Sequence, residues 1–333
     1  MPGVPLALGP LALLLAGAPS DVQTVPPPPA AAPAEPQTPA EELAAAIVAL
    51  GQIEGRMTVP VRIADAGPYN FVIDTGAERT VISRELARNL RLPAGREVNV
   101  IAMSGSARVG TYVIPSIRVS SVPDIGTIHA PALNALHLGG LGLVGIDMLR
   151  DHAVVIDFDA GTMSVYPSTK RKRALPRNRN EIVVRAKSLF GQLIVTDAMF
   201  ADQPIRVVID TGSPISVGNS ALRRLVRRSA GRMRPLALTS AIGGTVDTDY
   251  AYVSDIRVGD IRFGDMPVAF ADVVPFERFG LDDRPAMLLG MNSLKYFRQV
   301  RIDFANREVR FLLPRREKMG YRCNTIVARS CAG

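Results

Sequence analysis

Apolar residues occur along the chain in short runs of Val, Ile and Leu that are separated by Gly and Pro. Residues 71–73 and 207–209 are two such runs. Short runs rich in β-branched residues and bounded by Gly or Pro predict strands rather than helices. Aromatic residues make up only 5% of the chain and Trp is absent, so aliphatic side chains must fill the core. The pattern therefore predicts an all-β fold.

The N-terminal residues follow a different pattern. Residues 6–18 form an apolar stretch that is short for a membrane span and ends in small residues, as in a signal peptide, although no Lys or Arg precedes it. We expect residues 1–18 to be a signal peptide, which implies a periplasmic or secreted protein; the alternative is an apolar, Ala-rich disordered start. Residues 19–39 are rich in Pro and Ala, as in a semi-extended tether. A capping-box pattern at residues 38–41 then predicts a short helix that ends near Gly51.

The length of 333 residues and the hydrophobic content of 47% suit a folded chain with two domains of ordinary size. The formal net charge is +8, and much of it lies in two basic clusters, residues 170–179 and 223–228. Neither cluster has interleaved aromatic residues, which disfavours nucleic acid as a partner. A solvated linker and a solvated helix face are the favoured interpretation, and peripheral association with an anionic membrane surface is left open.

The residue types that bind metals and cofactors are sparse. The three His residues lack ligand spacing, so the sequence predicts no metal site. Residues 140–145 fit the dinucleotide pattern G-x-G-x-x-G, but the strand and the full helix that must flank it are missing, so no cofactor is expected. Cys323 and Cys331 are close in sequence and could form a disulfide in an exported protein; the alternative is two free thiols.

The triplet Asp-Thr-Gly occurs twice, as Asp74-Thr75-Gly76 and Asp210-Thr211-Gly212, and each copy follows one of the apolar runs. Further matches between the halves are residues 143–149 with 288–294 and residues 155–158 with 301–304. A repeat this long indicates domain duplication. The predicted organisation is a first lobe at residues 40–168 that includes the N-terminal helix, a basic linker at 169–180, a second lobe at 181–314 and a tail at 315–333.

Each half also contains a candidate hairpin between the triplet and the matched segment. Gly105 lies at the tip of the first hairpin and Gly243 at the tip of the second. Glycine supplies the positive φ that tight hairpin turns require.

Residues 74–82 (Asp-Thr-Gly-Ala-Glu-Arg-Thr-Val-Ile) resemble the active-site strand and loop of retropepsin-like aspartic proteases, and residues 210–216 are similar. The segments around Gly145 and Gly290 resemble those that support the catalytic loop in bacterial single-chain members with two Asp-Thr-Gly triplets. The resemblance covers about residues 56–168 and 181–314. It implies two retropepsin-like lobes in one chain, which form a pseudo-dimer with a central cleft, and a monomeric enzyme.

The resemblance also implies roles for single residues. Asp74 and Asp210 are the expected catalytic pair, and Thr75 and Thr211 are expected to lock the two loops together. Gly76 and Gly212 leave room for the substrate backbone. Ser213 carries a hydroxyl that could donate to Asp210. Gly145 and Gly290 are expected to support the loops, and Gly105 and Gly243 to be the tips of two flaps over a bound peptide. Retroviral members often have Arg where this chain has Ile146 and Met291, so Glu78, the partner of that Arg, is not carried over as a binding residue.

Two carboxyls that share one proton can activate water and protonate a peptide carbonyl without metal or cofactor. The favoured function is therefore an aspartic endopeptidase that hydrolyses exported or periplasmic polypeptides. The main alternative is a catalytically silent pseudo-protease that binds extended peptides under the flaps. A membrane-surface scaffold that acts through the basic segments is a further alternative.

Overall fold

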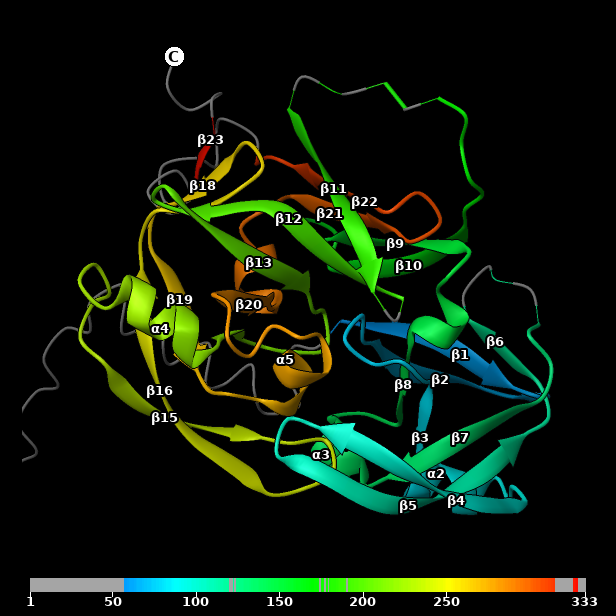
Figure 1. Cartoon of the computed structure of the whole chain (residues 1–333). Coiled ribbons are helices and arrows are strands. Elements are labelled where there is room, and N and C mark those ends of the chain that lie inside the picture. Colours follow the sequence, from blue (N-terminus) through cyan, green and yellow to red (C-terminus); the bar gives the residue numbers. More distant parts are fainter. Residues whose placement is uncertain are drawn as a thin grey trace, which may run out of the picture. The chain divides into compact units, whose positions relative to one another are not determined.

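The computed structural model describes residues 57–314, except residues 120, 121, 123, 174, 177, 179 and 190, and also residues 326–328. Strands predominate in this part of the chain (Figure 1), so the all-β prediction is confirmed. None of its helices is long and apolar enough to cross a membrane. The predicted signal peptide, tether and N-terminal helix lie outside the described residues, as do Cys323 and Cys331.

The first lobe is built on a sheet with the strand order β4-β5-β7-β3-β8-β2-β1-β6. Its strands are β1 (Thr58–Ile63), β2 (Ala66–Ile73), β3 (Val81–Ser83), β4 (Ala94–Ala102), β5 (Gly105–Ile114), β6 (Ile117–Val119), β7 (Ile128–Leu133) and β8 (Gly142–Val144). Its helices are α2 (Arg84–Asn89), α3 (Ala135–Leu138) and the 3₁₀ turn η1 (Ile146–Met148).

The second half follows with the strands β11 (Glu181–Leu189), β12 (Gln192–Phe200), β13 (Gln203–Ile209), β14 (Ser216–Gly218), β15 (Arg234–Thr239), β16 (Thr245–Val253), β17 (Ile256–Val258), β18 (Ile261–Phe263), β19 (Met266–Phe270), β20 (Ala286–Leu289), β21 (Gln299–Asp303) and β22 (Glu308–Leu312). Its helices are α4 (Ser220–Val226), α5 (Val274–Arg278) and α6 (Met291–Leu294). Strand β23 (Ile326–Ala328), within the predicted tail, pairs with β18.

The two halves repeat the same local topology. Strand β2 pairs in parallel with β8, and β3 pairs antiparallel with β8. In the second half, β13 and β14 pair with β20 in the same two senses. The hairpins β4–β5 and β15–β16 occupy equivalent places in the chain. This correspondence confirms two retropepsin-like lobes related by duplication.

Strands β9 (His152–Asp157) and β10 (Thr162–Pro167) end the first repeat but do not join the first lobe's sheet. β9 pairs antiparallel with β21, so the order runs β10-β9-β21-β22-β11 into the second half (Figure 1). The fully buried Ile156 lies opposite the fully buried Val300 in this pairing. The terminal strands of both repeats thus form one shared sheet, which joins the two halves through backbone hydrogen bonds.

Burial patterns explain how the strands position the triplets. Along β1, Val59, Val61 and Ile63 are buried and the residues between them are exposed, as in a strand with one face on the core. The last three residues of β2 and of β13 are instead all buried. Because packing on both faces holds the end of such a strand in place, the residue that follows it also has a defined position. Each Asp-Thr-Gly triplet begins directly after a strand end of this kind.

Candidate active site

Asp74 and Asp210 occupy equivalent positions at the ends of β2 and β13. The backbone N–H of Asp74 donates to the carbonyl oxygen of Val144 at 3.0 Å, and that of Asp210 donates to Leu289 at 3.0 Å. These acceptors end β8 and β20, the parallel neighbours of β2 and β13. Each aspartate is therefore held by the strand beside its own.

Each carboxylate is also fixed by its own loop. Oδ1 of Asp74 accepts hydrogen bonds from the backbone N–H groups of Gly76 and Ala77, at 2.8 and 3.0 Å. Oδ1 of Asp210 accepts the same two bonds in the second loop, at 3.0 and 3.2 Å. Such bonds close a tight turn in which the carboxylate has one orientation.

Thr75 and Thr211 join the two loops. The Thr75 hydroxyl donates to the carbonyl oxygen of Ile209 at 2.8 Å, and the Thr211 hydroxyl donates to that of Ile73 at 2.7 Å. The backbone N–H of each threonine donates to the hydroxyl of the other, at 3.1 and 3.0 Å. Both side chains are buried, with 2% and 4% of their surface exposed. This reciprocal set of bonds joins the two loops directly.

The triplet glycines place the two carboxylates against opposite loops. A Cβ atom on Gly76 would lie 2.9 Å from Oδ1 of Asp210, and one on Gly212 would lie 2.2 Å from Cγ of Asp74. Because a side chain at either glycine would displace a carboxylate, both positions require glycine. Each carboxylate therefore packs against the glycine of the opposite triplet, which brings the two aspartates to one place in the molecule.

Gly145 and Gly290 lie directly behind the loops. A Cβ atom on Gly145 would lie 2.4 Å from the backbone carbon of Arg79, and one on Gly290 would lie 2.5 Å from that of Ile215. Backbone atoms cannot move aside cheaply at these distances. The supporting segments thus contact the loops as expected, and only glycine permits the approach.

Each support also contains a pair of hydrogen-bonded side chains that was not predicted from the sequence. Oδ1 of Asp147 accepts from the backbone N–H and the hydroxyl of Thr80, at 2.9 and 2.8 Å. In the second half, Oδ1 of Asn292 accepts from the same two groups of Ser216, at 2.8 and 3.0 Å. Each hydroxyl residue stands at the same distance after its aspartate, and each acceptor stands two residues after its glycine. Alignment of the two repeats could have revealed both pairs.

The two predicted hairpins are present, and their tips touch. The backbone N–H of Ser104 donates to the hydroxyl of Ser240 at 3.4 Å, and the Ser104 hydroxyl donates to the carbonyl oxygen of Gly243 at 3.2 Å. Gly105 has φ +133° and Gly243 has φ +96°, so both tips use the conformation that favours glycine.

Each hairpin tip also packs against the opposite half of the chain. Met103, from the first hairpin, packs against a buried cluster of the second half that includes Leu238 and Phe276. Ile242, from the second hairpin, packs against a first-lobe cluster that includes Leu138 and Val81. The contacts at the tips thus connect the two lobes, as flaps in a closed arrangement would.

One expected contact is wrong. The hydroxyl of Ser213 donates to the carbonyl oxygen of Ile215 at 2.6 Å, so its single proton is not given to Asp210. Ser213 reaches Asp210 through its backbone N–H instead. The reason is local geometry, because the loop turns back after Ser213 and places the carbonyl oxygen of Ile215 next to the hydroxyl.

Among the described residues, two contacts of the first loop have no equivalent in the second loop. Gln192, with 2% of its surface exposed, donates from Nε2 to the carbonyl oxygen of Gly76. Arg278 on α5 forms an ion pair with Glu78 at 2.6 Å. The residue equivalent to Glu78 in the second loop is Pro214, which cannot form such a pair. Repeat symmetry gives no signal for either contact.

In the described part of the chain, no group of three or more His, Cys, Asp or Glu side chains is placed so that it could hold a metal ion. The polar groups that converge at the centre of the site are the two carboxylates and the backbone and hydroxyl groups that fix them.

The fold and the paired triplets define the class of two-lobed, retropepsin-like aspartic proteases. Residues 59–151 match the family model of gag-polyprotein aspartyl proteases, and residues 196–293 match a second family model described as aspartyl protease. No curated protein sequence matches the chain. The chain belongs to the aspartyl proteases, with two of their domains in tandem, and is an aspartic-type peptidase.

Proposed function

We propose that the protein is an endopeptidase in which Asp74 and Asp210 together activate a water molecule, and that it acts on exported or periplasmic polypeptides. The observation that carries the catalytic part is the reciprocal bonding of Thr75 and Thr211. It holds the two aspartate loops in one arrangement, which a pair of cooperating carboxyls requires. The cellular location is supported by the apolar stretch at residues 6–18.

The proposed reaction needs one proton on the pair of carboxyls. Two carboxyls that lie close together share a proton, because the repulsion between two negative charges disfavours the state in which both are ionised. The ionised carboxylate takes a proton from water while the water oxygen attacks the scissile carbonyl carbon. The protonated carboxyl gives its proton to the carbonyl oxygen. Collapse of the tetrahedral intermediate breaks the C–N bond. The leaving nitrogen takes the proton that the first carboxylate received from water, and a hydroxyl of the intermediate returns its proton to the second carboxylate, so the pair again holds one proton.

The surrounding residues prepare this reaction. The absence of a side chain on Gly76 and Gly212 lets a peptide backbone approach the carboxylates. The flap tips around Ser104 and Gly243 bond to each other, so they can cover a peptide that lies beneath them. An extended peptide fits because flap strands can hydrogen-bond to its backbone. Both aspartates come from one chain, so we propose that the active form is a monomer.

The test is digestion of a peptide library by the purified protein, followed by mass spectrometry of the products. We expect cleavage within peptides, inhibition by pepstatin, and no cleavage by Asp74→Asn. Asp202→Asn is the matched control, because it makes the same chemical change at an exposed turn away from the triplets. Peptides that bind with unchanged affinity to wild type and Asp74→Asn, but are cleaved by neither, would instead indicate a peptide-binding protein.

A further inference from the structure

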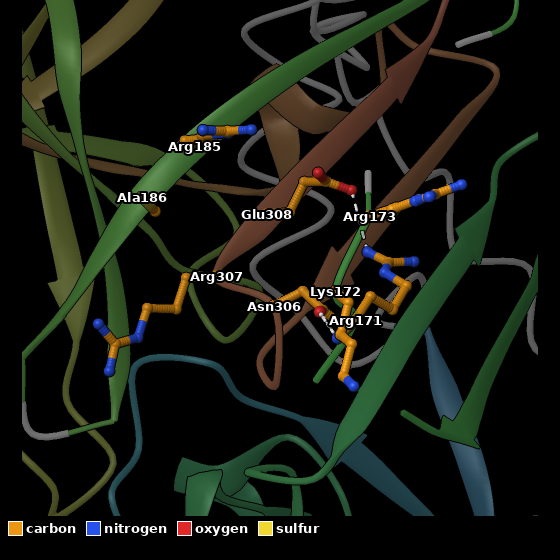
Figure 2. Close-up of a pocket in the computed structure, with 8 residues that line it drawn as sticks. All are labelled: Arg171, Lys172, Arg173, Arg185, Ala186, Asn306, Arg307 and Glu308. Atoms are coloured by element: carbon orange, nitrogen blue, oxygen red, sulfur yellow. Dashed lines mark hydrogen bonds and ion pairs between the residues drawn. The ribbon is translucent and has the colours of Figure 1, made fainter. Parts of the chain in front are cut away.

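A cavity of about 340 Å³ lies where the linker between the repeats meets the shared sheet (Figure 2). Residues 171–173 of the linker line one wall, and residues of β11, of the β21–β22 turn and of the start of β22 line the rest. The charged residues of the lining are five cations and one carboxylate: Arg171, Lys172, Arg173, Arg185, Arg307 and Glu308. The cavity is therefore strongly positive.

The charges beneath the cavity balance one another. Glu308 is buried and bonds to Arg171 at 3.2 Å and to Arg310 at 2.6 Å. Asp303 is 1% exposed and lies 3.3 Å from the same Arg171. The full network has three arginines and three carboxylates: Arg171, Arg301, Arg310, Glu181, Asp303 and Glu308. Glu308, the one carboxylate of the lining, is thus already neutralised by Arg171 and Arg310. It supplies no negative charge to the other cations of the lining.

Four cations remain around the opening, and we call them the rim: Lys172, Arg173, Arg185 and Arg307. All four are exposed, and within the described residues none of them has an ion pair with a carboxylate. In the view of Figure 2, Arg173 lies on one side of Glu308, and Arg185 and Arg307 lie on the other. The position of Arg185 beside Glu308 is set by the pairing of β11 with β22, in which the two residues are register partners. The rim therefore carries about four unmatched positive charges around one cavity.

The walls are held in place without a ligand. The backbone N–H of Arg171 donates to Oδ1 of Asn306 at 2.9 Å, and Nδ2 of Asn306 donates to the carbonyl oxygen of Thr169 at 3.0 Å. The linker is thus bonded to the β21–β22 turn on both sides of residue 170. A ligand that enters this cavity has little chain to order, which favours binding.

We propose that this cavity binds a compact phosphate-bearing anion, either free or as the headgroup of a lipid, and that the anion ties the linker to the shared sheet. Guanidinium groups match phosphate oxygens with two parallel hydrogen bonds. A phosphate monoester carries about −1.5 to −2 charges at neutral pH, so a single small ligand of this kind neutralises much of the rim. The volume is at the low end of the range for small-molecule sites, about 300–1,000 Å³. The eight lining residues include no aromatic side chain on which a nucleic-acid base could stack.

The test compares two double variants with the same loss of charge. Arg173→Gln/Arg307→Gln removes two rim cations and leaves the balanced network intact. Arg227→Gln/Arg228→Gln removes two exposed cations at the end of α4, outside the cavity lining. Binding of inorganic pyrophosphate is measured by calorimetry on the whole protein. Flotation is measured with vesicles of phosphatidylcholine alone and with added anionic phosphatidylglycerol.

We expect one pyrophosphate per chain, with a dissociation constant at least about tenfold weaker in the rim variant and within about twofold of wild type in the α4 variant. Binding to anionic vesicles alone, lost only in the rim variant, would also support the site and would identify a lipid headgroup as the source. The proposal is overturned by equal loss in both variants, which indicates general attraction to a basic surface, or by absence of binding to both probes.

Discussion

Replacement of Thr75 by Val removes one hydroxyl from the link between the two loops and keeps the shape of the side chain. This hydroxyl donates to Ile209 at 2.8 Å and accepts from the backbone N–H of Thr211 at 3.0 Å. The site is buried, so both partners lose a bond where water cannot replace it. At about 1–3 kcal/mol for each unsatisfied buried group, the expected loss in the free energy of unfolding is about 2–6 kcal/mol. That is a large share of the about 5–15 kcal/mol of a typical domain.

The assay is urea denaturation followed by circular dichroism, with peptide hydrolysis measured on the same samples. Thr75→Ser is the matched control, because it keeps the hydroxyl and loses one methyl group, which costs about 1 kcal/mol. Thr75→Val/Thr211→Val should lose less stability than the sum of the single variants, because the two hydroxyls hold the same pair of loops. If Thr75→Val is no less stable than Thr75→Ser, the link between the loops does not stabilise the fold as argued.

The remaining predictions concern the flap, the loop support, the dyad environment and the oligomeric state. Gly105→Val should lower turnover more than Gly110→Val, a control on the same strand without positive φ; equal effects would show that the tip conformation is unimportant. Gly145→Ala should destabilise the protein by more than about 1 kcal/mol because its Cβ would meet backbone at 2.4 Å, and a melting temperature equal to that of wild type would contradict this. Ser213→Ala should leave the pH–rate profile unchanged, since the hydroxyl is bonded to Ile215; a shifted acid limb would show that it reaches the dyad. Specific activity should stay constant on dilution, and loss at low concentration would indicate a required dimer.

The centre of the site was predictable from the sequence because the structure allows only one residue type at each of the duplicated positions there. Asp74 and Asp210 each need a buried strand before them and a glycine two residues later, and Gly145 and Gly290 each face backbone. Such requirements leave the same short pattern in both halves. The hairpin tips were predictable for the same reason, since positive φ selects glycine.

Contacts without a repeated pattern could not be predicted. The bond from Gln192 to Gly76 and the ion pair of Glu78 with Arg278 join residues far apart in sequence, and within the described residues neither has a counterpart in the second loop. The Ser213 hydroxyl had two acceptors within reach, and only the turn of its loop decides between them. The shared sheet is a further case, because β9 resembles any other strand of its repeat and nothing in the sequence says that it pairs with β21.

The most direct test of the central claim is the rate of peptide hydrolysis by Asp74→Asn and Asp210→Asn, each compared with Asp202→Asn at matched concentration and with the fold checked by circular dichroism. If the two carboxyls act as a pair that shares one proton, each active-site variant loses at least about 100-fold in turnover while the control stays within about twofold of wild type. Turnover within tenfold of wild type in either active-site variant would contradict the account, because one aspartate would then suffice.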